Sequence, residues 1–159
     1  MRRSIILLPA FFLLVLGCAR SLIPEVSYWD PQRNMVREKG YWLSVVSDSG
    51  TSEWVQHGTW RSYYGDGTKN SEIRFRRGRI VGTAKYWHPN GQVRQVVPYN
   101  DHGLPHGAVR WWDTNGVLLV TSAMTNGTGK DYYFYPDGRI RKIVHFHNGT
   151  PGLAENFSE

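Results

Sequence analysis

The sequence predicts an all-β chain, an antiparallel meander of repeated β-hairpins that forms one elongated single sheet. Three observations predict it: a glycine-centred motif that recurs four times between Gly58 and Gly152, hydrophobicity that alternates with a period of two, and Asp-Gly or Asn-Gly pairs between strand-like runs. A motif held in register over copies of 22 to 25 residues is the signature of a repeat protein. A lone hairpin is only marginally stable in water, so neighbouring copies must stabilise one another.

Every copy opens with a glycine and carries an Asx-Gly pair whose glycine lies nine residues downstream. The copies span residues 58–81, 82–106, 107–128 and 129–151. We expect the glycines of the pairs to form hairpin turns, and these glycines are Gly67, Gly91, Gly116 and Gly138. An aromatic residue stands five positions after each opening glycine: Tyr63, Trp87, Trp112 and Phe134.

The Asx-Gly pairs predict type I′ turns, in which both central residues have φ above zero. A further glycine in each copy would reverse the chain at the opposite edge of the sheet, and it lies beside Arg77, His102, Asn126 or Asn148. No helix is expected between Gly40 and Gly149.

Within the copies, apolar residues recur at even positions counted from the glycine of the pair, as in Val97 and Tyr99. Odd positions are mostly polar or charged, as in Arg94. We therefore expect the even positions to face a core and the odd positions to face water. The third copy departs from this pattern, because Val117 and Leu119 make its outward face apolar as well.

The N-terminus has the pattern of a cleaved signal segment. Two arginines, Arg2 and Arg3, precede an apolar run at residues 5–16, which is shorter than the roughly 20 residues that a membrane-spanning helix needs. The run ends in Gly17 and Cys18, and this ending resembles the lipobox of bacterial lipoprotein signal peptides. The resemblance implies that residues 1–17 are removed and that Cys18 carries a diacylglyceryl thioether and an acylated amino group, such as a palmitate.

Two or more acyl chains anchor a protein firmly to a bilayer. By resemblance to the bacterial sorting rule, Ala19 after the cysteine favours the outer membrane, so we expect a lipid-anchored protein of the cell envelope. An ordinary signal peptide in which Cys18 is incidental remains the alternative.

The rest of the chain flanks the repeats. We expect a tether and an irregular N-terminal segment at residues 18–39, a degenerate leading repeat at 40–57 and a C-terminal tail at 153–159, since terminal repeats are usually atypical. The formal charge of +6 falls to +4 without Arg2 and Arg3, because residues 1–17 contain no Asp or Glu. This mild basicity is compatible with an anionic lipid, a cell-wall glycan or an acidic protein, and we expect no nucleic acid.

The sequence offers no catalytic constellation. A single cysteine excludes an intramolecular disulfide and a Cys-rich metal site. His102 with His106, and His145 with His147, are the only paired metal candidates, and no acidic residue or thiol completes either pair in sequence. The carboxylates of Asp66, Asp113 and Asp137 are explained by turns. We therefore expect no enzyme, no metal and no cofactor.

Two groups of residues could carry binding. The first contains cations expected on the water-facing side of strands or at edge turns, namely Arg74, Arg76, Arg77, Arg79, Arg139 and Arg141. The second contains aromatic residues, namely Tyr64, Tyr86, Trp111 and Tyr133. Adjacent residues on a strand point to opposite faces, so either some of these rings form an exposed contact patch or the sheet is covered on both sides.

The copies resemble the MORN-repeat variant family, through forms such as Gly-x-x-x-Tyr-Trp-x-x-Asn-Gly-x-Val-Arg over residues 82–94. The resemblance covers residues 58–152 and implies an array of hairpins with a binding or scaffolding surface. It leads us to expect a non-enzymatic, lipid-anchored envelope protein that binds another protein. Some bacterial members are catalogued as antitoxin-like, so an immunity protein is one alternative. A phospholipid-headgroup or glycan-binding module is the other.

Overall fold

The computed structural model describes residues 21–47 and 49–158, and these residues form strands without any helix. The all-β class and the antiparallel meander of hairpins are confirmed. The expected signal peptide and Cys18 lie outside the described residues. Within the described part of the chain, no helix has the length and hydrophobicity to cross a membrane.

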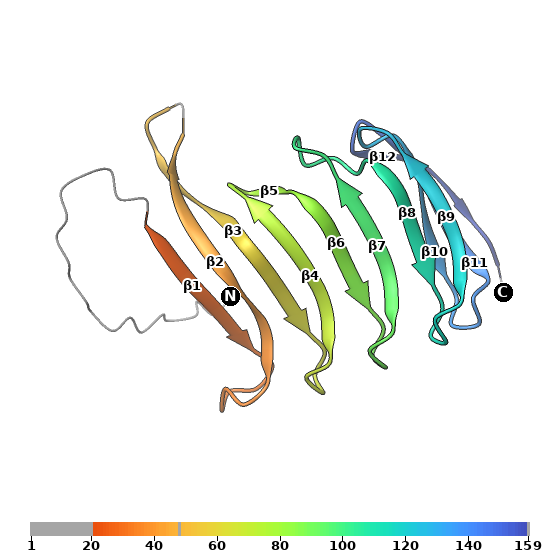
Figure 1. Ribbon diagram of the computed structural model, residues 1–159, viewed down its shortest axis with the longest axis horizontal. Helices are drawn as coiled ribbons and strands as arrows, with labels where there is room; N and C mark the ends of the chain where they lie inside the picture. Colours follow the sequence, from red (N-terminus) through yellow and green to blue (C-terminus); the bar gives the residue numbers. More distant parts are fainter. Residues whose placement is uncertain (1–20, 48, 159) are drawn as a thin grey trace.

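The strands form two sheets (Figure 1). The strands of the first sheet are β1 (Leu22–Tyr28), β2 (Val36–Val46), β3 (Ser52–Tyr63), β4 (Lys69–Arg76), β5 (Arg79–Ile80), β6 (Gly82–Trp87), β7 (Val93–Tyr99), β8 (Gly107–Trp112) and β9 (Leu118–Met124). The strands of the second sheet are β10 (Gly129–Phe134), β11 (Ile140–His147) and β12 (Thr150–Asn156). The expected N-terminal segment thus contributes β1 and the start of β2, and β12 extends into the expected tail.

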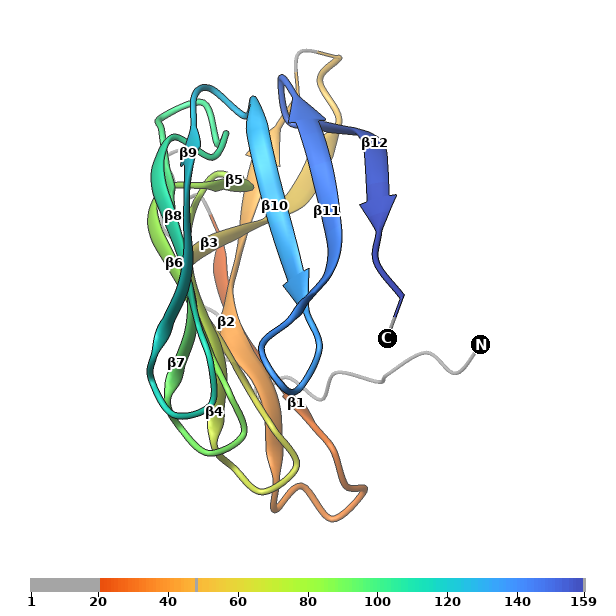
Figure 2. The ribbon, with the colours of Figure 1, turned by 90° about the vertical axis from the view of Figure 1, so that its right-hand side faces the viewer.

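The expectation of one single sheet is corrected by the fourth hairpin. In the first sheet, strands follow sequence order from β1 to β9, with β5 paired only to β4. The chain then leaves this sheet, and β10 to β12 form a second layer, which lies beside the first sheet in the edge-on view of Figure 2. Burial explains the break, because a broad apolar sheet face must pack against another element.

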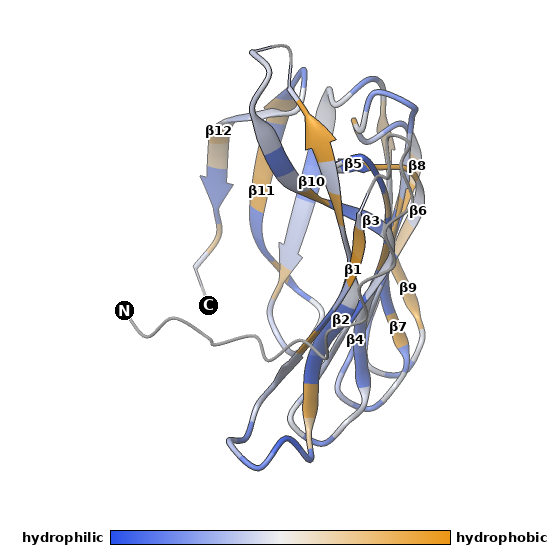
Figure 3. Ribbon diagram, turned by 90° about the vertical axis from the view of Figure 1, so that its left-hand side faces the viewer, coloured by the Kyte–Doolittle hydropathy of each residue, from blue (hydrophilic) through white to orange (hydrophobic). Residues whose placement is uncertain are grey.

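The main core lies between the two layers. We call the covered face of the first sheet the inner face, and the opposite face the outer face. Four buried side chains of the inner face form the cluster Val97, Val109, Trp111 and Met124. Tyr132 and Phe134 of β10 and Phe146 of β11 pack against it, and the Trp111 and Tyr132 rings meet edge to face at 5.4 Å. Both sheets contain apolar and polar stretches of chain (Figure 3).

A smaller aromatic core holds the start of the array. Trp60 is 4% exposed and its ring lies over Gly40, where a Cβ atom would come within 2.3 Å of the ring. The Trp42 and Phe75 rings meet it edge to face, with centroids at 5.1 and 6.4 Å. The indole nitrogen of Trp60 donates to the Tyr41 carbonyl at 3.1 Å. The leading repeat is therefore packed onto the first regular copy.

The Asx-Gly pairs do reverse the chain, but the predicted turn type is wrong. At the first pair, the Gly67 amide donates to the Tyr64 carbonyl at 3.0 Å, and the Tyr64 amide donates to Thr68 at 2.8 Å. Gly67 has a φ of 86°, whereas Asp66 is not among the residues with positive φ. This is a type I turn followed by a glycine bulge, and the strand register shifts beside it. The carboxylate of Asp66 accepts the Thr68 amide at 2.9 Å, which holds the turn.

Type I′ turns occur at the opposite ends of the hairpins. Both central residues have positive φ at the pairs Arg77 and Gly78, Asn126 and Gly127, and Asn148 and Gly149. Asparagine and glycine tolerate this conformation best, which explains their use at two of these turns.

Hydrogen bonds between successive turns tie the first sheet together. In each case a side chain reaches the backbone carbonyl of the aromatic residue in the next repeat. The bonds run from Trp29 to Tyr63 at 3.1 Å, from Tyr64 to Trp87 at 2.8 Å and from His88 to Trp112 at 2.9 Å. The series stops at Asp113, whose carboxylate instead accepts the amides of Asn115 and Val117 in its own turn. The first sheet ends with this hairpin.

Candidate functional site

A row of side chains crosses the outer face of the first sheet. Directly opposite residues on neighbouring antiparallel strands share a face, so strand pairing alone places the row. Its members, from β2 to β9, are Lys39, Arg61, Glu72, Lys85, Val96, Arg110 and Thr121. We call this set the outer row. Cations dominate it, and Lys85 and Arg110 are exposed and make no ion pair with any described residue.

Half-buried aromatic rings lie beside the outer row. Tyr63, Trp87 and Trp112 end their strands on the outer face, and cations cover two of the rings. The Lys39 ammonium is 5.3 Å from the Tyr63 ring centroid, and the Lys69 ammonium is 4.5 Å from that of Trp87. Such contacts hold a flexible lysine over a ring without removing its charge.

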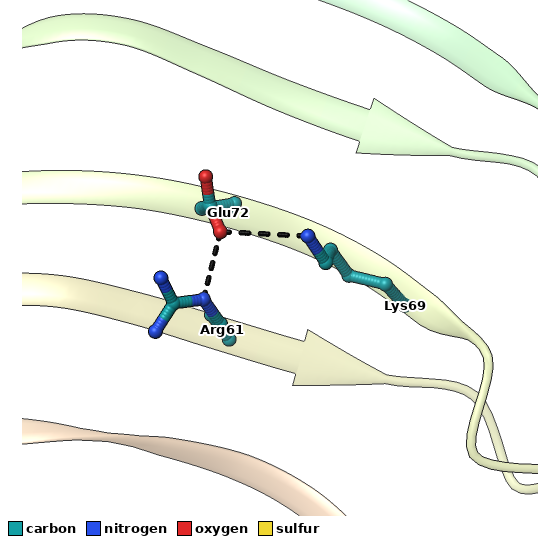
Figure 4. Close-up of polar contacts among 3 residues, drawn as sticks. All are labelled: Arg61, Lys69 and Glu72. Carbon is teal, nitrogen blue, oxygen red and sulfur yellow. Dashed lines mark hydrogen bonds and ion pairs between the residues drawn. The ribbon is translucent and has the colours of Figure 1, made fainter.

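Glu72 is the only carboxylate of the outer row. Its Oε2 accepts from Arg61 Nε at 2.7 Å and from Lys69 Nζ at 3.5 Å (Figure 4). The hydrogen bond from Arg61 is the main cause that lowers the pKa of Glu72 below its ordinary value. Glu72 thus pairs with the cations of β3 and β4, whereas Lys85 and Arg110 make no ion pair with a carboxylate of the described residues.

The structure separates the arginines that the sequence groups as binding candidates. Arg74 and Arg76 lie in β4 near the outer row, and Arg76 is paired with Asp101 at 2.7 Å. Arg77 is a turn residue, and Arg79 lies in β5. The other two belong to the second sheet, where Arg139 pairs with Asp137 at 2.7 Å and Arg141 is exposed in β11.

The aromatic candidates divide between a covered and an open face. Trp111 is 4% exposed and Tyr86 is partly buried, and both pack in the core between the layers. Tyr64 is engaged by its bond to the neighbouring turn. Tyr133 is 40% exposed, with the Lys142 ammonium 5.9 Å from its ring centroid. The second sheet thus covers the inner face over β6 to β9, whereas half-exposed rings remain on the outer face.

Two of the histidines that the sequence marks as metal candidates have other partners. His106 Nδ1 accepts the Asn126 amide at 3.2 Å, and His145 Nε2 contacts the carboxylate of Glu155 on β12. Strand pairing between β11 and β12 brings this acidic residue to His145, which the sequence alone does not reveal. Among the described residues, no three His, Cys, Asp or Glu side chains gather as a metal site.

A cavity of about 310 Å³ lies between the layers, and sequence reasoning missed it. Its polar lining includes Tyr86, Gln95, Tyr99 and Asp131. Gln95 Nε2 donates to Asp131 Oδ1 at 3.3 Å, and the Tyr132 amide donates to the same oxygen at 3.0 Å. Burial raises the pKa of Asp131, and it also raises the pKa values of both tyrosines.

A signal for Asp131 does exist in the sequence. It stands two residues after an opening glycine, where the other copies place the buried residues Trp60, Ala84 and Val109. A carboxylate at a core position of a repeat breaks the pattern, and such breaks are expected at functional or strained sites.

Asp131 gives a pH-dependent prediction. Its folded pKa lies above the ordinary value, so the unfolded chain loses this proton at lower pH and the ionised carboxylate destabilises the fold. We expect Asp131→Asn to raise Tm relative to the wild type at pH 7, with the difference shrinking as pH falls toward 4. Thermal unfolding of both proteins from pH 4 to pH 8 measures this; a difference independent of pH would contradict it. The tyrosines around Asp131 have raised pKa values and stay neutral throughout.

Comparison with known proteins supports the repeat assignment. Residues 56–76 and 80–101 match the model of the MORN repeat variant family. These segments cover most of the first two copies, including β4, β6 and β7. Neither a curated protein nor a solved structure shows a significant match to the chain.

Proposed function

We propose that this chain, with its two MORN repeat variant segments, is a non-enzymatic, lipid-anchored protein of the cell envelope that binds a partner protein. The outer row carries the proposal. Its cations Lys85 and Arg110 make no ion pair with any described residue, and the half-exposed rings of Trp87 and Trp112 lie beside the row. Aromatic residues and arginine are enriched at protein interfaces, and complementary charge steers the encounter, so the partner presents an acidic surface.

The anchor fits the position of β1. Only residues 19–21 separate Cys18 from this strand, so a lipid on Cys18 would keep β1 within about 15 Å of the acylated residue. The β1 end of the first sheet carries exposed apolar side chains, among them Leu22, Val26 and Trp29. This end would face the bilayer, while the outer row over β6 to β8 would extend away from it.

Charge reversal tests the outer row. We expect the double variant Lys85→Glu/Arg110→Glu to lower recovery of the cross-linked partner from membranes by about tenfold or more. The two introduced carboxylates would repel the acidic surface of the partner, which the native cations attract. The control is Lys130→Glu/Arg141→Glu, which changes the formal charge equally at exposed positions of the second sheet. The measurement is quantitative mass spectrometry of cross-linked complexes.

Equal recovery in both double variants would contradict the proposed surface.

The anchor is tested in the same cells with Cys18→Ser and an alkyne-bearing palmitate: labelling of the wild type and its loss in the variant are expected. Anionic lipid headgroups could contact the same cations. Retention of the Cys18→Ser protein on anionic liposomes, lost with Lys85→Glu/Arg110→Glu, would assign the surface to lipid instead of protein.

A further inference from the structure

The cavity between the layers has a chemical character that differs from the outer face. Its walls are largely aromatic and aliphatic, with the rings of Tyr86, Tyr99 and Phe146 and the side chain of Val97. Asp131 is the only lining residue with a charged form at neutral pH. At about 310 Å³, the cavity is at the small end of ligand pockets.

Asp131 lacks a cationic partner within the described part of the chain. It makes no ion pair there, and its carboxylate accepts hydrogen bonds from the Gln95 side chain and the Tyr132 amide. Burial is the main cause that raises its pKa. Asp131 is partly buried, and a carboxylate that loses part of its contact with water without gaining a counter-charge is destabilised. A positively charged guest would offset that cost.

The surrounding rings favour the same guest. Aromatic faces attract organic cations, and the effect strengthens where water is excluded. The guanidinium of Arg94 already lies over the Tyr86 ring, 5.9 Å from its centroid. A hard metal ion would need several oxygen ligands, and the described carboxylates do not gather here.

We propose that this cavity is a binding site for a small organic cation of the alkylammonium class, with Asp131 as its counter-ion and Tyr86, Tyr99 and Phe146 as its aromatic wall. Gln95 holds the carboxylate toward the cavity through its bond at 3.3 Å. The site lies on the covered face of the first sheet, so it is independent of binding at the outer row.

Two probes of nearly equal shape test the charge requirement: choline, and its neutral carbon isostere 3,3-dimethylbutan-1-ol. We expect the full chain in a non-ionic detergent to bind choline at least about tenfold more tightly than the alcohol, by calorimetry. Ring signals of Tyr86 and Tyr99, assigned by their Phe variants, should shift on saturation. Equal affinity for the two probes, or no saturable binding of choline, would overturn the proposal.

The variant Asp131→Asn keeps the side-chain shape and removes the charge. It should lose the preference for choline, whereas Asp137→Asn, which alters an exposed turn carboxylate of the same sheet, should retain it. Retention of the preference in Asp131→Asn would place the cation elsewhere and reject the site. The comparison of the two probes on the wild type decides the matter if this variant does not fold.

Discussion

Replacing Trp111 with alanine will destabilise the protein by about 3–5 kcal/mol, the usual loss for a large buried aromatic residue. The Trp111 ring is 4% exposed and meets the Tyr132 ring of the second sheet at 5.4 Å. Its removal takes packing from both layers at once. Because the chain has 159 residues, the loss corresponds to a fall in Tm of about 10 °C, measured by circular dichroism.

The neighbouring Trp112 is a matched control. It has the same side chain on the same strand, but it lies half-buried on the outer face. Since the hydrophobic contribution scales with the area removed from water, we expect Trp112→Ala to cost about half as much. Equal losses at the two positions would mean that the inner face is not covered, and the two-layer arrangement would be wrong.

The positions of the turns could be read from the sequence, but their types could not. Asx-Gly pairs suit both a type I′ turn and a type I turn with a glycine bulge, since both turns place a glycine where φ is positive and the type I′ turn also accepts the Asx residue at positive φ. The two differ in how many residues separate the paired strand ends, and this register depends on contacts across strands. Gly67 and Gly127 therefore occupy different turns although both follow an Asx residue.

The second layer could not be predicted from the period-two pattern, which is the same in both sheets. The position of β10 is determined by the apolar face that it covers. That packing joins residues distant in sequence. One hint was available in the third copy, whose outward residues are apolar. The side chain of Leu119 lies 3.3 Å from where a Cβ on Gly138 of the second sheet would stand. Leu119 therefore contacts the turn between β10 and β11 from β9, the strand at the edge of the first sheet.

The candidate surface was likewise predictable from the sequence only in part. The sequence identifies Arg74 and Arg76 as water-facing cations, and the structure places them in β4, as the alternation requires. The sequence does not identify Lys85 and Arg110 as a pair, because they are far apart in the chain. They lie in one row only through the pairing of β6, β7 and β8. The outer row depends on which residues of neighbouring strands lie opposite one another, and the sequence pattern does not reveal this register.

Gly127→Ala will destabilise the protein by about 3–4 kcal/mol, because the two layers meet at this residue. Gly127 has a φ of 77°, which costs an L side chain about 1–2 kcal/mol. An added Cβ would also lie 2.5 Å from the Gly149 nitrogen, which belongs to the turn between β11 and β12. Relieving this clash requires a shift of the backbone, and such overpacking costs about 1–3 kcal/mol more.

Hydrogen bonds prevent an easy shift of either turn. The Gly149 amide donates to the Gly127 carbonyl at 3.0 Å, and the Gly127 amide donates to the Pro105 carbonyl at 2.8 Å. We therefore expect the variant to expose the Gly149 amide to faster hydrogen exchange as well as to lower the unfolding free energy. Gly91→Ala is the control, because Gly91 has a φ of 84° and no atom within 4 Å of an added Cβ. It should lose only the conformational part, about 1–2 kcal/mol. The contact between the two turns would be contradicted if both variants lost the same free energy of unfolding and hydrogen exchange at Gly149 were unchanged. The contact that closes the second sheet over the first would then have to lie elsewhere.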